Sequence, residues 1–256
     1  MARDDVASET REDTGQPTLV FIHGSGDSAR RWDTLMARLP AYSCLALDLP
    51  GHGRLTGEPG PSELTVAGYA ELVAQELTRR GLSDVCVVGH SLGSAIALTL
   101  ALEWPALTGR IVLIGAGARL RVLPELLEGA RTDPETTRAA LVRLGHAPGH
   151  EQAAEQAIAE EPPVAPGMLY RDLAACNAFD VMDELARVRQ SALIITGAQD
   201  RLTPPKYAEF LRQRLPRATG VVIPGAGHYV MNEAPDAVAA AISSWLRTQN
   251  QVAREP

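Results

Sequence analysis

Gly89-His90-Ser91-Leu92-Gly93 lies between an apolar run, Val85-Cys86-Val87-Val88, and a stretch from Ser94 to Trp104 that is typical of a helix. A Gly-x-Ser-x-Gly pentapeptide between a strand and a helix predicts a sharp turn, which strains the backbone of the serine and exposes its hydroxyl. The flanking glycines fit this turn, because larger side chains would crowd it and the neighbouring strand. The N-terminus of the following helix directs free backbone N–H groups at whatever the hydroxyl attacks. The pattern therefore predicts that Ser91 is a nucleophile.

Two downstream segments supply the partners that a nucleophilic serine needs, a base and a group that orients the base. Asp200 follows the predicted buried strand Leu193–Gly197, and His228 follows the next apolar run, Val221–Pro224. Ser91, Asp200 and His228 then all come after the carboxyl ends of parallel strands, where open α/β sheets place their chemistry. We expect them to act together as nucleophile, orienting carboxylate and base.

The order Ser…Asp…His resembles that of the α/β-hydrolase superfamily. The likeness is to the small, lid-bearing serine esterases and runs from about Thr18 to Leu246. Four further segments are similar to the oxyanion loop, the D-x-P-G-H-G turn, the return from the lid, and the histidine loop of that family. They are His23-Gly24-Ser25-Gly26, Asp48-Leu49-Pro50-Gly51-His52-Gly53, the segment from Arg171 to Asp180, and the segment from Pro224 to Pro235.

The resemblance implies hydrolysis of a carboxylic ester through an acyl-enzyme on Ser91, with no cofactor and no metal. His228 would move the proton and Asp200 would hold its imidazole. Two backbone N–H groups would stabilise the oxyanion, each worth about 3 kcal/mol in the transition state. Leu92 is expected to supply one and Ser25 the other, with Gly26 as the alternative to Ser25.

The apolar runs predict an α/β fold with an open, mostly parallel sheet. The expected strands are Leu19–His23, Cys44–Leu49, Val85–Gly89, Arg110–Gly115, Leu193–Gly197 and Val221–Pro224. Because most of these runs are continuously apolar, helices should cover both faces. The expected helices are Arg30–Leu39, Val66–Arg80, Ser94–Glu103, Pro205–Leu215 and Pro235–Leu246.

The pattern of strands and helices divides the chain into a core, an insertion and two tails. The core comprises residues 18–118 and 191–248, and flexible tails are expected at 1–17 and 249–256. Residues 1–17 are too short and too polar for the two strands that open the full family fold, so we expect those strands to be absent.

In residues 119–190 the alternation of strands and helices stops, and this pattern predicts an inserted helical lid. Its expected helices are Leu120–Gly129, Pro134–Leu144, His150–Glu160 and Met168–Asn177. The lid would shape the substrate pocket and exclude water; the alternative is that it only covers apolar surface.

We expect His90 to point away from the pocket. The side chains expected to bind substrate are Trp32, Leu120, Leu123, Met168, Leu169, Phe179 and Tyr229.

Composition narrows the class of partner. With 24 basic and 31 acidic residues, the net charge of −7 argues against nucleic acid or an anionic membrane as the main partner. No signal peptide or membrane-spanning run is visible, which favours a cytoplasmic protein. The three cysteines, Cys44, Cys86 and Cys176, are an odd, scattered set; Cys44 and Cys86 fall inside apolar strands and are expected to be small core residues rather than a disulfide or metal site. His146 and His150 are expected to be solvated loop residues rather than metal ligands. The partner is then a small ester, and a monomer and a dimer both remain open.

Other reactions use the same residues. A carbon–carbon bond hydrolase acting on a diketone-like substrate, a cofactor-free perhydrolase and a slow-turnover ligand sensor all remain alternatives. Epoxide hydrolases and haloalkane dehalogenases are excluded, because these similar proteins place Asp where Ser91 stands. The pocket that the lid forms would decide among the remaining reactions. Lid sequences vary too freely to indicate which reaction applies.

Overall fold

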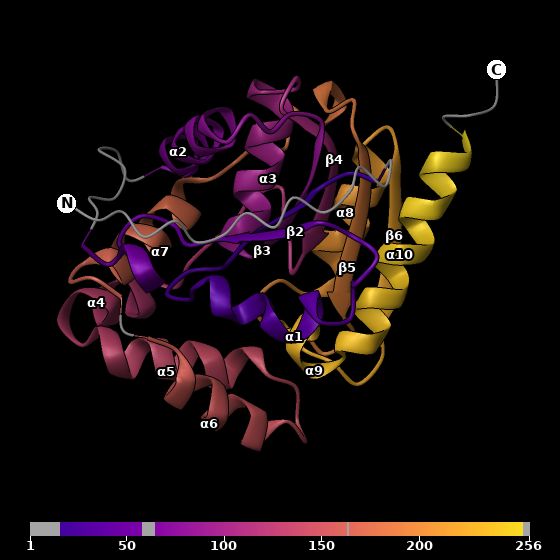
Figure 1. Cartoon of the computed structure of the whole chain (residues 1–256). Helices are drawn as coiled ribbons and strands as arrows, with labels where there is room; N and C mark the ends of the chain where they lie inside the picture. Colours follow the sequence, from indigo (N-terminus) through magenta and orange to yellow (C-terminus); the bar gives the residue numbers. More distant parts are fainter. Residues whose placement is uncertain (1–15, 58–64, 163, 253–256) are drawn as a thin grey trace.

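The computed structural model describes residues 16–57, 65–162 and 164–252. Its centre is an open sheet of six parallel strands in the order β2-β1-β3-β4-β5-β6 (Figure 1). The strands are β1 (Leu19–Ile22), β2 (Cys44–Leu47), β3 (Val85–His90), β4 (Thr108–Ile114), β5 (Ser191–Gly197) and β6 (Ala218–Ile223). This confirms the predicted fold class and places a strand at each of the six predicted runs.

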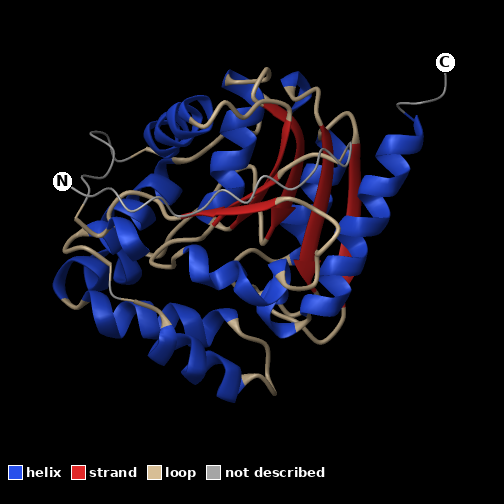
Figure 2. Ribbon diagram, viewed as in Figure 1, coloured by secondary structure: helices blue, strands red, loops and turns tan. Residues whose placement is uncertain are grey.

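Helices cover both faces of the sheet (Figure 2). Helices α2 (Val66–Arg79), α3 (Leu92–Glu103) and α8 (Pro205–Arg214) pack on one face, and α1 (Asp33–Met36) and α10 (Pro235–Val252) on the other. Successive strand side chains point to opposite faces. In β1, Val20 and Ile22 enter the first core while Leu19 and Phe21 enter the second. Burial on both sides explains why the inner strands β1, β3 and β5 are continuously apolar.

Two helices of the core differ most from their predicted bounds. The expected helix over 30–39 is a 3₁₀ helix, η1 (Ala29–Trp32), followed by the short α1; Ser28 begins it by accepting the Arg30 N–H. Helix α10 continues to Val252, so residues 249–252 are helical rather than part of a tail. No glycine or proline interrupts this stretch after Pro235.

The remaining expectations about the tails fall on residues 1–15 and 253–256, which lie outside the described residues. The predicted absence of the two strands that open the full family fold also concerns this N-terminal part of the chain. Gln16 is described, and its Oε1 accepts a hydrogen bond from Asn250 Nδ2 in α10.

The insertion between β4 and β5 contains helices α4 (Pro124–Thr132), α5 (Pro134–Gly145), α6 (Glu151–Glu160) and α7 (Met168–Ala178). Helix α4 starts later than predicted, because Leu120 N–H bonds to the Phe179 carbonyl and holds the preceding segment extended. Figure 1 shows α4, α5 and α6 at lower left, with α7 between them and α2. Short elements complete the fold: η2 (Gly53–Leu55), η3 (Leu185–Arg187) and α9 (Val230–Glu233).

Candidate active site

Ser91 occupies the sharp turn between β3 and α3. Its backbone has φ 52° and ψ −114°, and residues other than glycine rarely adopt a positive φ. A Cβ atom at Gly89 would lie 2.1 Å from the Gly93 carbonyl oxygen, and one at Gly93 would lie 2.1 Å from that of Ile22. Both glycines are therefore required for this turn, as the pentapeptide predicts.

His228 and Asp200 meet beside this turn. His228 Nδ1 lies 2.9 Å from Asp200 Oδ2, and both side chains are buried. The carboxylate can only accept, so Nδ1 carries the proton and Nε2 is left with its lone pair. Burial alone would raise the pKa of Asp200. The charge of His228 and hydrogen bonds from His228 and Thr203 outweigh this and hold that pKa below its usual value.

Thr203 is a functional candidate that the sequence reading missed. Its Oγ1 lies 2.8 Å from Asp200 Oδ2 and 3.0 Å from His228 Nδ1. The backbone N–H groups of Leu202 and Thr203 donate to the other oxygen, Asp200 Oδ1, at 2.9 and 2.8 Å. Its position three residues after Asp200 was the available signal, since short polar side chains there can bond back to the carboxylate.

The loop after β1 is braced by hydrogen bonds. His23 donates from Nδ1 to the Gly24 carbonyl at 2.8 Å, and its Nε2 accepts the Leu49 N–H at 3.0 Å. Burial, reinforced by the charge of His52, lowers the pKa of His23 to about 4, so its ring is neutral. The Gly26 N–H donates to Asp172 Oδ2 at 2.8 Å. Gly26 is therefore not available to an oxyanion, and Ser25 is the remaining choice in this loop.

Asp172 in α7 ties this loop to two other elements. Its Oδ1 accepts the Tyr69 hydroxyl from α2 at 2.5 Å, and its Oδ2 lies 2.9 Å from His52 Nε2. Burial alone would lower the pKa of His52, but the adjacent Asp172 carboxylate outweighs it and raises that pKa. From the sequence, Asp172 could be recognised only as part of the segment from Arg171 to Asp180, which resembles the return from the lid.

A cavity of about 90 Å³ adjoins Ser91 and His228; we call it the Ser91 cavity. The core loops and α8 provide one part of its wall and the insertion the other. The core residues are Gly24, Ser25, Asp27, His90, Ser91, Leu202, Thr203, Tyr207, His228 and Tyr229, and the insertion residues are Leu120, Arg121, Val122, Leu126, Leu141, Leu173 and Cys176. The wall is thus mainly apolar on the side of the insertion.

Only Leu120 and Tyr229 of the predicted substrate-binding side chains line this cavity. Leu123, the N-cap residue of α4, is 63% exposed. The others are buried in packing contacts elsewhere: Trp32 against Phe21, Met168 near Gly51, Leu169 near Gly26, and Phe179 in the core on the α3 face.

His90 differs from its expected orientation. It lines the Ser91 cavity, and its ring centroid lies 4.6 Å from that of His228 and 5.1 Å from that of Tyr229. Its Nε2 donates to the His228 carbonyl at 3.1 Å. Burial, with the charges of His228 and Arg31, lowers the pKa of His90 well below its usual value. A neutral His90 therefore braces the histidine loop.

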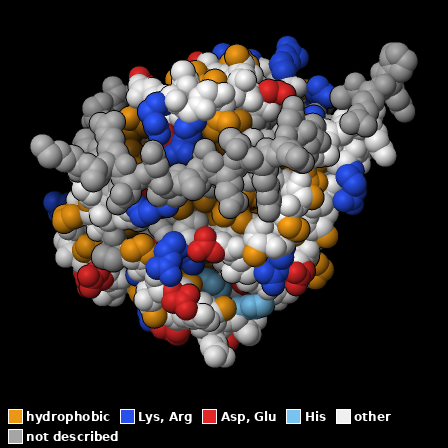
Figure 3. Space-filling view, viewed as in Figure 1, with side chains coloured by type: hydrophobic (Ala, Val, Ile, Leu, Met, Phe, Trp, Pro, Cys, Tyr) orange, Lys and Arg blue, Asp and Glu red, His pale blue; other side chains and the backbone are white. Residues whose placement is uncertain are grey.

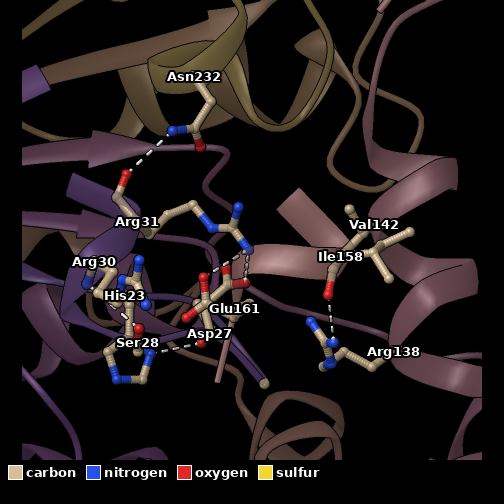
Figure 4. Close-up of polar contacts among 12 residues, drawn as sticks. His23, Asp27, Ser28, Arg30, Arg31, Arg138, Val142, Ile158, Glu161 and Asn232 are labelled. Carbon is tan, nitrogen blue, oxygen red and sulfur yellow. Dashed lines mark hydrogen bonds and ion pairs between the residues drawn. The ribbon is translucent and has the colours of Figure 1, made fainter. Parts of the chain in front are cut away.

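A second polar group, the Arg31 cluster, adjoins the Ser91 cavity through Asp27 (Figure 4). It comprises the buried Asp27, Arg31 and Glu161 and the half-buried Arg138. Arg31 Nη2 lies 2.5 Å from Asp27 Oδ1 and 3.2 Å from Glu161 Oε2, and its guanidinium lies 5.1 Å from the Tyr229 ring centroid. Within the described residues, Asp27 Oδ2, Arg31 Nε, Arg138 Nη1 and Glu161 Oε1 have no hydrogen-bond partner. No motif or spacing in the sequence indicates this cluster.

Among the described residues, no group of three or more His, Cys, Asp or Glu side chains is arranged to hold a metal ion. No helix within them has the length and apolar character needed to cross a membrane. On the face shown in Figure 3, acidic and basic side chains are interspersed.

Known proteins resemble this chain over nearly its whole length. A model of the alpha/beta hydrolase family matches residues 19–241. The pimeloyl-[acyl-carrier protein] methyl ester esterase of Nitrosomonas europaea is 30% identical over 244 residues, which cover 87% of this chain and 93% of that protein. Among solved structures, a thermophilic esterase is 32% identical, with a TM-score of 0.75 and coverage of 91% and 90%. The enol-lactonase of Burkholderia xenovorans LB400 is 20% identical with a TM-score of 0.84 over 93% and 94%, a likeness of fold alone.

Proposed function

Since the chain belongs to the alpha/beta hydrolase family, we propose that it is a serine hydrolase that cleaves carboxylic esters of small to medium acyl groups. One observation carries the proposal: the strained turn presents Ser91 on the same cavity as His228, whose Nδ1 is held by Asp200 at 2.9 Å. The names of the esterase relatives support the same class of reaction.

In the proposed reaction, the Ser91 hydroxyl attacks the ester carbonyl while His228 Nε2 takes its proton. The C–O bond to the alcohol then breaks, and the imidazolium returns the proton to the departing oxygen. A water molecule attacks the acyl-enzyme in the same way and releases the acid. Asp200 stabilises the imidazolium in both steps, and its lowered pKa keeps it ionised at neutral pH.

Backbone donors would stabilise the negative charge on the carbonyl oxygen. Leu92 is the first residue of α3, where N–H groups have no partner within the helix. Ser25 lies on the cavity wall in the braced loop after β1. Gly26 is excluded because its N–H is bonded to Asp172. We assign Leu92 and Ser25 as the two donors.

The insertion acts in this proposal as a lid over an apolar acyl site. Leu120, Val122, Leu126, Leu141 and Leu173 line the cavity from that side. Apolar walls bind an acyl chain by removing it from water, and a closed cover limits competing contact with solvent. The small cavity favours short and medium chains over long ones.

The test compares wild type with Ser91→Ala on p-nitrophenyl acetate, butyrate and octanoate. We expect turnover by the wild type and a loss of at least about 10³-fold in Ser91→Ala, because the nucleophile and base act as a unit. Near-normal turnover by Ser91→Ala would refute the proposal. Inactivity of the wild type on all esters with cleavage of a diketone would favour carbon–carbon hydrolysis, and tight binding without turnover would favour a sensor. Peracid formation from the acid and hydrogen peroxide would reveal perhydrolysis.

A further inference from the structure

Thr203, Asp200 and His228 form a closed triangle of polar atoms. Thr203 Oγ1, Asp200 Oδ2 and His228 Nδ1 are separated by 2.8, 2.9 and 3.0 Å. All three residues are buried. The arrangement differs from a simple His–Asp pair, because a neutral hydroxyl contacts both members at once.

The donors and acceptors in this triangle can be assigned from their chemistry. Asp200 accepts only, so the Nδ1 proton of His228 faces it. The hydroxyl of Thr203 has a single proton. This proton goes to Asp200 Oδ2, because the protonated Nδ1 has no lone pair that could accept it. The remaining lone pair of Thr203 Oγ1 then faces the Nδ1–H. Thr203 is therefore a donor to the carboxylate and an acceptor for the imidazole at the same time.

We propose that Thr203 is a positioning residue that holds the reactive tautomer of His228 through its hydroxyl. Two acceptors at Nδ1 disfavour the alternative tautomer with the proton on Nε2, which could not take a proton from Ser91. The hydroxyl also holds Asp200 Oδ2, to which it donates at 2.8 Å. The backbone bonds to Asp200 Oδ1 come from Leu202 and Thr203 themselves and do not depend on the side chain.

This inference rests on the proposed function, and two substitutions separate the hydroxyl from the shape of the side chain. Thr203→Val keeps the volume and loses the hydroxyl, whereas Thr203→Ser keeps the hydroxyl and loses the methyl group. Thr196→Val is the matched control: Thr196 is buried in β5, and its Oγ1 has no hydrogen-bond partner within the described residues. Ser91→Ala is measured alongside.

We expect Thr203→Val to lower kcat by about 10- to 100-fold, the loss typical of a hydrogen bond to a charged group. KM should change much less, and the loss should be the same for acetyl, butyryl and octanoyl esters although Thr203 lines the cavity. Thr203→Ser should recover most of this loss, and Thr196→Val should behave as wild type. In proton NMR spectra of the folded variants, the low-field Nδ1–H signal should move in Thr203→Val and not in Thr196→Val.

The opposite order of the two variants would overturn the inference. If Thr203 serves only to pack, Thr203→Val keeps its activity and Thr203→Ser loses it. A loss in Thr203→Val that depends on acyl length would assign Thr203 to substrate contact instead. An inactive Ser91→Ala with a fully active Thr203→Val refutes this inference alone, whereas an active Ser91→Ala refutes the proposed function itself. If Thr203→Val does not fold, the position of the Nδ1–H signal in Thr203→Ser, compared with wild type, decides: a shift contradicts the hydroxyl's role.

Discussion

Helices α6 and α7 belong to one insertion, yet they are attached to the core in different ways. Helix α7 buries Met168, Leu169, Leu173 and Cys176 along with the Asp172 carboxylate, and it contacts α2 and α3. Helix α6 buries only Ala154 and packs against α5. The difference indicates that α7 is part of the scaffold that holds the loop of Ser25 and Gly26, while α6 is a more separable cover.

A buried carboxylate marks each attachment, and the two differ in how well they are paired. Both oxygens of Asp172 accept hydrogen bonds, from Tyr69, His52 and Gly26. Glu161, just after α6, has one oxygen 3.2 Å from Arg31 and the other without a partner among the described residues. A buried polar atom without a partner costs free energy, whereas a fully paired one leaves its partners unsatisfied when it is removed. Loss of Asp172 should therefore be the more damaging.

The largest effect is expected from Asp172→Ala. Three donors would lose their acceptor, and we expect the free energy of unfolding to fall by about 3–5 kcal/mol, as when one partner of a buried charged pair is removed. kcat should fall as well, because Gly26 no longer holds the loop that carries Ser25. Urea unfolding and ester turnover of the same preparations measure both.

Asp172→Asn provides the matched control for this prediction, since its amide oxygen can still accept either the Tyr69 bond or the two bonds made to Oδ2. It should lie between wild type and Asp172→Ala in both measurements. A loss of stability below about 1 kcal/mol in Asp172→Ala, a value typical of ordinary surface changes or single neutral bonds, would contradict the view that α7 is part of the scaffold.

The fold was predictable where one-dimensional patterns determine it. Each of the six strands coincides with a predicted apolar run. In the inner strands, burial between two helical layers requires apolar side chains on both faces, whereas the edge strand β6 stays largely exposed. Ser91, Asp200 and His228 could be selected because parallel strands end at a common edge. Met168 and Phe179 were misplaced because an apolar side chain in a helix carries no sign of which neighbour buries it. The roles of Asp172 and Thr203 depend on contacts between distant segments, or on a hydroxyl with no periodic pattern.

A smaller effect, dependent on pH, is expected from Glu161→Gln. Burial and the nearby charge of Asp27 outweigh Arg31 and raise the pKa of Glu161. The folded protein therefore binds this proton more tightly than the unfolded chain does, and the contribution of Glu161 to stability falls as the pH rises from the usual glutamate value through the raised pKa. The difference in unfolding free energy between wild type and Glu161→Gln should shift in favour of the variant over this window. Unfolding at intervals between pH 4.5 and pH 8 measures it.

Asp200 supplies the contrast for this pH dependence, because its pKa is lowered. Its contribution to stability is present above the unfolded value and is lost as the pH falls through the lowered pKa. Asp200→Asn should therefore differ from wild type in its pH slope only below about pH 4, near the ordinary aspartate value. A slope of the same sign for both carboxylates would contradict the opposite pKa shifts of Glu161 and Asp200.

The smallest effect should be a change in selectivity, and it separates cavity walls from scaffold. Leu141 in α5 lines the Ser91 cavity, whereas Met168 in α7 is buried near Gly51 and does not. Leu141→Ala enlarges the acyl site, so the ratio of kcat/KM for octanoyl to acetyl esters should rise. The expected rise is about 10- to 200-fold, which corresponds to about 1–3 kcal/mol in transition-state binding. Met168→Ala should leave this ratio unchanged even if it costs stability, since a ratio does not depend on the fraction of folded enzyme. A shift toward octanoyl esters in Met168→Ala, with none in Leu141→Ala, would instead place α7 on the acyl wall and α5 outside it.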